Sequence, residues 1–444
     1  MWKTFSIGGI HPHEKKLSAD RPIMPVLPSG QVAILLGQHI GAPAKPLVSK
    51  GDRVKVGTKI AEPVGVVSAA IHSSVSGCVN KIDAVIDASG YPKPAVFIDV
   101  EGDDWEEGID RSDTLVKECN LTADEIVGKI ADAGIVGMGG ACFPTHVKLC
   151  PPSTCRPECL IVNGVECEPF LTADHQLMLE HAEEIMVGVF ILMKAIRVNK
   201  AFVGIENNKP DAIRLMKKVA AAYAGIEIVP LQMKYPQGGE KQLIEAIMGR
   251  QVPAGALPVS VGAVVQNVST VFAVYQAVQK NKPLFERVVT VTGDGLSNPS
   301  NLCVRMGTPV RQLVEACGGL PEDTCKVICG GPMMGKALVN LDVPVSKGTS
   351  GILLMGGQEA RRSAVQPCIR CAKCVAVCPM GLEPYLLATA SAHGDFERAE
   401  NENILSCIEC GSCQFTCPSH RPILDYVRLG KAKVGAMIRA RKKG

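Results

Sequence analysis

The chain has 444 residues with a formal net charge of only +3, and 46% of its residues are hydrophobic but 4% aromatic. This balance provides neither a basic surface nor many base-stacking side chains, which argues against nucleic-acid binding. The length predicts about three domains. The longest apolar run, residues 185–193, is too short to span a bilayer. Because the start lacks an apolar signal region, we expect a cytoplasmic chain that contacts membranes through partners.

Residues 1–110 are predicted to form an all-β domain. Residues 30–100 are rich in Gly, Pro and β-branched residues, a composition typical of short strands separated by turns. The segment resembles a barrel-sandwich hybrid, the fold that carries biotin or lipoyl groups on a lysine at an exposed hairpin tip. The corresponding turn here is Val67-Ser68-Ala69-Ala70, without a lysine. We therefore predict a docking or structural module instead of a swinging-arm carrier.

Residues 111–284 are predicted to form an α/β domain behind an acidic linker at 101–113. A helix begins after Thr122, because Thr122 and Glu125 form a capping box, and ends at Gly134. Apolar runs then alternate with helical patterns, which predicts a parallel sheet with helices on both faces. The predicted strands are residues 160–162, 201–205, 226–231 and 263–265, and the predicted helices are residues 175–196, 211–223 and 240–248.

Three loops of this domain have the chemistry of a ligand site. They are a glycine-rich turn at 137–140, with Lys148 available for a phosphate, the Asn163 loop (163–169) and the Tyr235 loop (235–240). Such sheets bind ligands at strand ends and helix N-termini. Glycines let backbone N–H groups approach an anion, and a helix start adds the positive end of its dipole. Taken singly, each loop is more simply explained as a tight turn.

Residues 285–356 read as two strands joined by a turn, a short helix at 310–316 and a glycine-rich return. This order resembles the soluble-ligand-binding β-grasp module. The return, residues 326–334, is a candidate ligand loop, but a scaffold role is favoured.

Two cysteine runs, CIRCAKCVAVCP from Cys368 and CIECGSCQFTCP from Cys407, share the spacing Cys-x2-Cys-x2-Cys-x3-Cys-Pro. This is the bacterial pattern for four-iron clusters, in which the fourth cysteine ligates the other cluster. Zinc knuckles are the alternative, but zinc sites usually pair Cys-x2-Cys units across a gap. Residues 357–444 are thus expected to be a two-cluster, ferredoxin-like domain with helices at 386–390 and 396–399. The expected ligand sets are Cys368, Cys371, Cys374 and Cys417 for one [4Fe-4S] cluster and Cys407, Cys410, Cys413 and Cys378 for the other.

Of the nineteen cysteines, eight lie in these runs and eleven do not. Thiolate ligands require a reducing compartment, so free thiols are expected for the remainder. Five of the eleven gather near the candidate loops, with spacings that match no common third metal site: Cys142, Cys150, Cys155, Cys159 and Cys167.

The chain becomes basic after Pro418. A solvated helix end explains this pattern, and contact with an anionic membrane surface or a partner subunit is the alternative. Clustered basic residues gain about 1 kcal/mol each near anionic lipid. The residues concerned are Arg428, Lys431, Lys433, Arg439, Arg441, Lys442 and Lys443.

Taken together, the loops of the α/β domain resemble the flavin- and NADH-binding subunit of respiratory complex I and related diaphorases. That family carries a GxGGAGFPT loop, an NxDExEP loop, a glycine-rich loop ending in Glu and an Asn-Val-x-Thr segment. The chain has all four in the same order, at residues 137–145, 163–169, 235–240 and 266–270. Because all four segments match together, we no longer interpret the three loops as simple tight turns.

The resemblance implies a non-covalent FMN and NAD(H) as substrate. The positions that match FMN contacts are Gly137, Gly139, Gly140, Lys148, Asn163, Glu166, Tyr235, Gly238, Gln266, Asn267 and Thr270. The positions that match NADH contacts are Phe143, Glu168 and Glu240. The departures from the family pattern are Met138 for Arg, Cys142 for Gly, Val165 for Asp and Gly239 for Glu.

The order of domains resembles, across essentially the whole chain, the C subunit of Rnf-type ion-translocating electron transport complexes. This implies an NADH-dependent flavin and iron–sulfur oxidoreductase subunit, peripheral to the cytoplasmic side of the inner membrane. Its expected partners are the membrane and iron–sulfur subunits of the complex, with ferredoxin acting indirectly and ion translocation in the membrane partners. No protein residue is expected to be catalytic, because the hydride chemistry belongs to the cofactors.

Two alternatives stay open from the residues. One is a diaphorase subunit of a soluble oxidoreductase, such as a corrinoid reductase or hydrogenase, although the N-terminal domain and tandem clusters favour the membrane complex. The other is a non-catalytic iron–sulfur relay with a relic flavin domain, which the departures at Met138, Val165 and Gly239 would favour.

Overall fold

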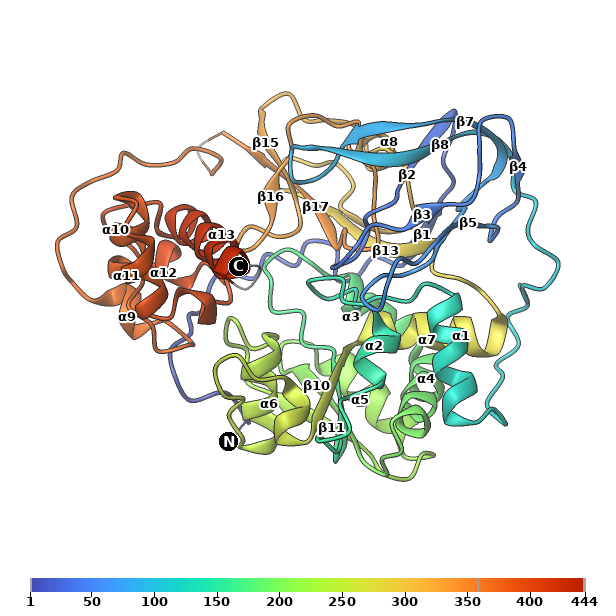
Figure 1. Cartoon of the computed structure of the whole chain (residues 1–444), viewed down its shortest axis with the longest axis horizontal. Helices are drawn as coiled ribbons and strands as arrows, with labels where there is room; N and C mark the ends of the chain where they lie inside the picture. The colour runs from blue at the N-terminus through green and yellow to red at the C-terminus, as the bar shows by residue number, and fades with distance from the viewer. Residues whose placement is uncertain (1, 358, 442–444) are drawn as a thin grey trace.

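The computed structural model describes residues 2–357 and 359–441, and its elements form the multidomain α/β architecture expected from the sequence (Figure 1). The central domain contains a four-stranded parallel sheet in the order β11-β10-β9-β12. All four predicted strands are confirmed. Their bounds are β9 (Cys159–Asn163), β10 (Ala201–Glu206), β11 (Ile226–Leu231) and β12 (Ala263–Asn267).

Helices cover both faces of this sheet, as the alternation predicts. One hydrophobic cluster packs α6 against one face, and a larger cluster packs the remaining long helices against the other. The bounds are α1 (Ala123–Asp132), α2 (Thr145–Leu149), α3 (Ala173–Glu180), α4 (Ala182–Ala195), α5 (Pro210–Ala220), α6 (Glu240–Met248), the 3-10 helix η1 (Pro258–Val261) and α7 (Val268–Lys280).

Local sequence signals predict some of the helix boundaries but not all of them. The capping box of Thr122 and Glu125 is present at the start of α1, as predicted. The single helix predicted for residues 175–196 is wrong, because it breaks at His181 between α3 and α4. His181 leaves the helical region with φ −125°, and its ring lies 4.5 Å from that of Phe272. The break in a locally continuous helical pattern therefore coincides with a tertiary contact.

The N-terminal barrel has its own small hydrophobic core, formed by two antiparallel sheets. The turn that would carry a prosthetic group is buried in this protein: Ala69 packs into the core that includes the central α/β domain, and the carbonyl oxygen of Ala70 accepts a hydrogen bond from Lys347. The tip of this hairpin therefore packs against other parts of the same chain. The strands are β2 (Gln31–Leu35), β3 (Lys45–Pro46), β4 (Arg53–Val54), β5 (Lys59–Glu62), β6 (Ile71–His72), β7 (Ser76–Ile86) and β8 (Pro92–Gly102).

The β-grasp module is a six-stranded mixed sheet in the order β1-β14-β13-β17-β15-β16. Its edge strand β1 (Ile23–Val26) comes from the N-terminal region and pairs in parallel with β14, a pairing that the sequence did not indicate. The helix at 310–316 is confirmed as α8 (Val310–Ala316). The other strands are β13 (Glu286–Thr292), β14 (Ser300–Arg305), β15 (Thr324–Cys329), β16 (Lys336–Ala337) and β17 (Gly351–Gly356).

Residues 2–22, which we call the N-terminal strap, connect three parts of the molecule (Figure 1). Lys3 bridges to Leu231 at the sheet edge, and Ile10 bridges to Tyr235. The backbone N–H of Gly9 donates to the carbonyl oxygen of Val377 in the C-terminal domain at 2.9 Å. A Cβ on residue 8, a glycine with φ +69°, would lie 2.6 Å from the backbone of the neighbouring cysteine run. Close backbone approach therefore requires glycine there.

The C-terminal domain is helical, and the two predicted helices within its linker are confirmed as α10 and α11. None of the helices in the described residues is long and apolar enough to cross a membrane. The elements are α9 (Lys373–Ala376), α10 (Pro384–Ala392), α11 (Phe396–Asn401), η2 (Ile404–Ser406), α12 (Ser412–Phe415) and α13 (Ile423–Arg441).

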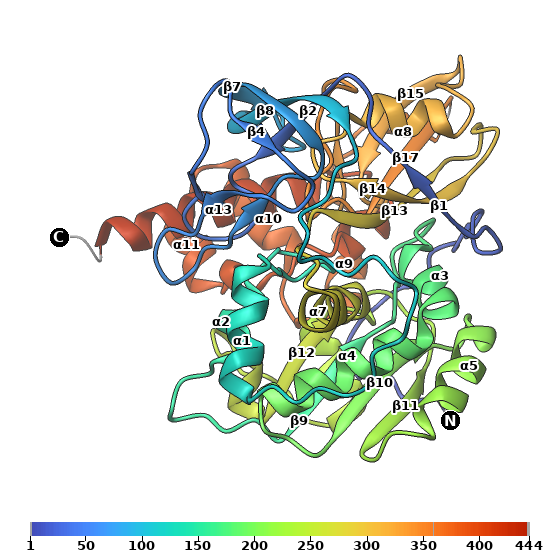
Figure 2. The ribbon, with the colours of Figure 1, turned by 90° about the vertical axis from the view of Figure 1, so that its right-hand side faces the viewer.

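Helix α13 packs on α10, and its C-terminal end extends beyond the rest of the domain (Figure 2). Part of its basic charge is neutralised within the domain, because Arg428 and Lys431 pair with Glu409, and Arg441 pairs with Glu400. The predicted basic residues Lys442 and Lys443 lie outside the described residues.

Candidate functional site

The candidate site lies at the carboxyl ends of the parallel strands, where ligands of such sheets bind. Asn163 ends β9 and is the register partner of Asn267, which ends β12. The side chain of Asn163 donates to the carbonyl oxygen of Gly238 at 2.9 Å. This hydrogen bond therefore ties the Asn163 loop to the Tyr235 loop.

The glycine-rich turn is held against the start of α7. The N–H of Met138 donates to the hydroxyl of Thr270 at 2.9 Å, and the N–H of Gly137 donates to the carbonyl oxygen of Phe143 at the same distance. A Cβ on Gly139 would lie 2.8 Å from the Cβ of Asn267, whereas a Cβ on Gly140 would meet open space. The turn thus combines one packed glycine with one that faces free volume.

Lys148 does not stand alone in the structure. Its ammonium donates to Glu240 at 2.5 Å and to the carbonyl oxygen of Val265 at 2.8 Å. The expected phosphate ligand and one expected NADH contact are therefore brought together, by α2 and by the first residue of α6.

The acidic side chains of the Asn163 loop have internal partners. Glu166 caps α3, because its carboxylate accepts from the backbone N–H groups of Asp174 at 2.8 Å and His175 at 3.1 Å. Glu168 accepts from the N–H groups of Met333 and Met334 in the β-grasp module at 2.8 and 2.9 Å. Burial raises the pKa of Glu168. The predicted scaffold segment 326–334 therefore contacts the candidate site directly.

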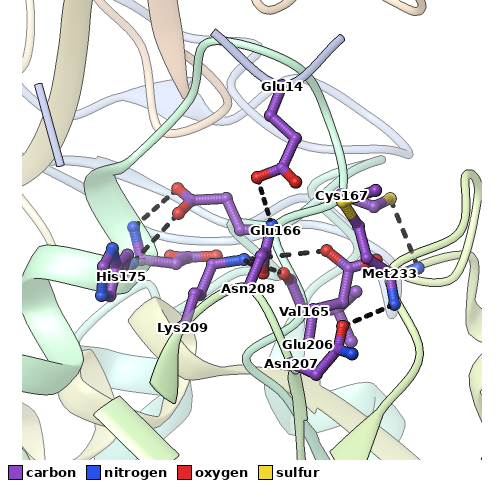
Figure 3. Close-up of polar contacts among 12 residues, drawn as sticks. Glu14, Val165, Glu166, Cys167, His175, Glu206, Asn207, Asn208, Lys209 and Met233 are labelled. Atoms are coloured by element: carbon purple, nitrogen blue, oxygen red, sulfur yellow. Dashed lines mark hydrogen bonds and ion pairs between the residues drawn. The ribbon is translucent and has the colours of Figure 1, made fainter. Parts of the chain in front are cut away.

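Two lysines donate hydrogen bonds to backbone carbonyl groups in or next to the same loop. No sequence pattern indicated either role. The ammonium of Lys16 donates to the carbonyl oxygens of Glu166, Glu168 and Leu171, at 2.9, 2.9 and 2.6 Å. Lys209 donates to the carbonyl oxygen of Val165 at 2.7 Å (Figure 3).

The second lysine has a buried counter-charge. Glu206 lies 3.7 Å from Lys209, and the two side chains are 1% and 2% exposed. Glu14 of the N-terminal strap reaches Asn208 beside them (Figure 3). The strap is therefore part of the support of the site.

Asp174 is a further functional candidate that sequence reasoning missed. It accepts hydrogen bonds from the side chains of Asn267, at 2.7 Å, and Ser269. Burial, and then the charge of Glu166, raises the pKa of Asp174 to about 6. Its place at the start of α3 looks locally like an ordinary acidic first turn, so only the fold reveals its contact with α7.

The residues present fit a flavin. Gln266 is 2% exposed, and its side-chain nitrogen has no partner within the described part of the chain. A buried amide without a partner is costly, so a polar group of a ligand at this strand end would complete it. Free volume at Gly140 and the cationic Lys148 nearby suit an aromatic ring and a phosphate.

The departures from the family pattern occupy packed positions. Met138 is 4% exposed and Val165 is fully buried, so both act as core residues. Gly239 is the N-cap of α6, and a Cβ there would lie 2.5 Å from Gln242. Cys142 contacts the β-grasp module, because a Cβ on residue 348 would lie 2.8 Å from its sulfur. Burial raises the pKa of the Cys142 thiol.

We name the two expected cysteine ligand sets by their surroundings. The inner set is Cys378, Cys407, Cys410 and Cys413, and the outer set is Cys368, Cys371, Cys374 and Cys417.

The inner set fits a buried cluster. All four of its cysteines line one cavity with apolar walls from α10 and α13. Burial raises the pKa of Cys407 to about 11, so cluster binding must displace protons. In the described residues no three His, Cys, Asp or Glu side chains gather closely enough for a single metal ion. A cubane spreads its thiolates over its corners and does not need such a gathering.

The two sets differ in exposure. Cys378 and Cys410 of the inner set are buried, whereas Cys368 and Cys371 of the outer set are exposed. The inner set also touches the flavin domain, since Tyr235 donates to the carbonyl oxygen of Cys410 at 2.8 Å. The expected flavin contact and one cluster are thus joined by a single hydrogen bond.

Comparisons with known families agree with this architecture. The chain matches the RnfC barrel sandwich hybrid domain over residues 3–103 and the Nuo51 FMN-binding domain over residues 130–276. It also matches the SLBB domain over residues 288–337 and the 4Fe-4S dicluster domain over residues 362–418. The chain therefore carries an FMN-binding domain and a two-cluster domain, and the zinc alternative is disfavoured.

Similar proteins cover nearly the whole chain. The C subunit of the proton-translocating ferredoxin:NAD(+) oxidoreductase complex of Clostridium ljungdahlii is 46% identical over 98% of this chain and 94% of that protein. The C subunit of the Na(+)-translocating complex of Acetobacterium woodii is 42% identical over 98% of both chains. This match favours the membrane complex over a soluble diaphorase.

A solved structure shares the fold. A chain of the NAD+-reducing [NiFe]-hydrogenase in the H2-reduced state matches with a TM-score of 0.51 and 21% identity, over 70% of this chain and 62% of that one. The full-length relatives, the four matching domains and the flavin and cysteine sites place this chain in the family of C subunits of ion-translocating ferredoxin:NAD+ oxidoreductase complexes.

Proposed function

We propose that the chain exchanges a hydride with NAD(H) and passes single electrons to the iron–sulfur and membrane subunits of such a complex. The contact between Tyr235 and Cys410 carries this proposal, because it joins the flavin side to the inner cysteine set in one chain. When bound, FMN supplies the conversion between a two-electron hydride and single electrons. In balance, NADH yields NAD+, one proton and two electrons, and the electrons leave one at a time.

The protein's own part is to position the flavin and exclude water. The buried hydroxyl of Thr270 fixes the glycine-rich turn, and the buried amide of Gln266 offers an unused donor. Lys148 offers a cation for the phosphate and releases Glu240 toward the nucleotide when it does so. We propose as FMN contacts Gly137, Gly139, Gly140, Lys148, Asn163, Glu166, Tyr235, Gly238, Gln266, Asn267 and Thr270, and as NADH contacts Phe143, Glu168 and Glu240.

The inner and outer sets are proposed as the ligands of the two [4Fe-4S] clusters. Cys378, from the first run, lines the same cavity as three cysteines of the second run. That placement supports crossed ligation, in which Cys417 completes the outer set.

The proposed location follows from the relatives, which are subunits of ion-translocating complexes. A chain that exchanges electrons with such a complex must lie against it. We therefore propose a peripheral position on the cytoplasmic side of the inner membrane, with ion translocation in the membrane subunits.

The test is anaerobic reconstitution of the full chain with iron, sulfide and FMN. The protein should retain flavin and two four-iron clusters, and its flavin absorbance should bleach on addition of NADH. Two clusters without flavin binding would refute the proposal. Flavin retention without NADH-dependent bleaching would instead favour the non-catalytic relay.

A further inference from the structure

The segment around the outer cysteine set is unusually open. Every residue from 361 to 373 is exposed, and the segment has no regular structure before α9. It is nevertheless anchored, because the N–H of Gln366 donates to Ser419 and the hydroxyl of Ser419 donates to Pro367, both at 2.9 Å. The anchoring places this segment beside Cys417.

Two large apolar side chains lie on this anchored segment. Val365 is 60% exposed and Ile369 is 67% exposed. Single exposed apolar residues need no explanation, but these flank Cys368, which is itself exposed. Apolar surface next to an exposed ligand of the outer set is what a redox partner would cover.

The charge around these side chains is positive. Arg361, Arg370 and Lys373 are exposed, and none forms an ion pair within the described ranges 2–357 and 359–441, whereas Arg362 pairs with Asp425. Unpaired cations around an apolar centre attract an acidic surface and accelerate encounter.

We propose that Arg361, Val365, Ile369, Arg370 and Lys373, named here the outer-cysteine surface, dock an iron–sulfur subunit of the complex through an acidic patch beside its own cluster. This inference rests on the proposed function. Cys410 of the inner set contacts the flavin domain through Tyr235, whereas Cys368 and Cys371 of the outer set are exposed. Electrons from the flavin therefore enter at the inner set and leave at the outer set.

A protein partner fits this surface better than a lipid surface does. Both would bind cations and apolar side chains, but only a redox protein can use the exposed cysteines Cys368 and Cys371. With a cluster bound at the outer set, each docking event would pass one electron to the partner's cluster, so that the outer cluster would be oxidised and the partner's reduced. No bond or proton needs to move.

The test uses the complete membrane complex with full-length variants Val365→Asp and Arg361→Glu, which lie outside the cysteine spacing. Matched controls are Val339→Asp, at a 65% exposed site in the β-grasp module, and Lys93→Glu on the exposed part of β8. The first measurement is how much of the chain stays bound to the purified partner subunits at low and high salt. The second is the iron and flavin content, with NADH-dependent reduction of ferricyanide.

Both surface variants should bind the partner subunits about tenfold more weakly, with iron, flavin and ferricyanide reduction unchanged. The Arg361→Glu complex should also lose part of its salt dependence. Both controls should bind as the wild type does. If the surface variants bind normally, the inference is wrong.

The remaining outcomes also decide the matter. Normal binding to the subunits together with lost binding to anionic phospholipid vesicles would assign the surface to lipid and overturn the inference. Failure of the proposed function itself would appear differently, as a wild-type chain whose flavin is not reduced by NADH.

Discussion

The phenol of Tyr235 donates a 2.8 Å hydrogen bond to the carbonyl oxygen of Cys410. The ring is 2% exposed, and burial raises the pKa of the phenol well above its usual range, so the group remains a donor at physiological pH. This bond couples the position of the flavin loop to that of the inner cysteine set.

Replacing Tyr235 with Phe removes this donor and leaves a buried carbonyl without its partner. We expect a loss of about 1–2 kcal/mol in the free energy of unfolding and slower reduction of the clusters after NADH is mixed with the protein. Chemical denaturation and stopped-flow absorbance measure these effects. If both quantities keep their wild-type values, the hydrogen bond does not couple the flavin loop to the inner cysteine set.

Replacing Lys16 with Met removes an ammonium that donates to two carbonyl groups of the Asn163 loop and to that of Leu171 just after it. Leaving these carbonyls unpaired should cost about 3 kcal/mol and weaken FMN retention, which flavin fluorescence after gel filtration measures. The adjacent Lys15 is a matched control, because it pairs with Asp294 and Glu359 at the surface. Lys15→Met should change stability by less than about 1 kcal/mol. Equal effects of both variants would contradict the assigned role.

Crossed ligation predicts which variants resemble each other. Cys378→Ala should remove the same electron paramagnetic resonance signal as Cys410→Ala, because both belong to the inner set. Cys417→Ala should instead match Cys374→Ala. If Cys378→Ala matches Cys374→Ala, each run holds its own cluster and the assignment fails.

Lys347 predicts a pH dependence of stability. Its buried ammonium donates to the carbonyl oxygens of Ala70 and Gly134, and burial lowers its pKa to about 7 from the ordinary value of 10.5. Between these values the unfolded chain binds a proton that the folded chain has lost. The free energy of unfolding therefore rises with pH across this window, by at most about 1.4 kcal/mol per pH unit.

The measurement is the difference between the wild type and Lys347→Met, which cancels other titrating groups. From pH 7 to pH 9 the wild type should gain stability relative to the variant. Parallel stability curves would show that the amine keeps its ordinary pKa.

Local patterns predicted the elements that local physics determines. The capping box at Thr122, the four apolar strands and the helix at 310–316 depend on neighbours in sequence, and the structure has them all. The break at His181 lies beside Phe272 of another helix, a neighbour that no local pattern indicates. The edge strand β1 depends on β14, so no local pattern marked it.

The candidate site also divides into residues that local patterns indicate and residues that act through distant contacts. Glycine and cysteine spacings carry local geometry, so motif residues such as Gly139 and Cys410 could be proposed as site residues from sequence alone. Lys16 and Asp174 act through partners far along the chain, Leu171 and Ser269 among them. A lone lysine or acidic residue has no spacing that distinguishes such a role from solvent exposure.

The N-terminal strap also constrains how the protein is made. Gly9 and Ile10 precede their partners Val377 and Tyr235 by hundreds of residues in the sequence. The strap therefore cannot pack against the backbone of Cys378 until both of these partner segments have been synthesised. Docking of residues 2–22 is thus a late step of folding, because it requires the Tyr235 loop and the first cysteine run to be in place.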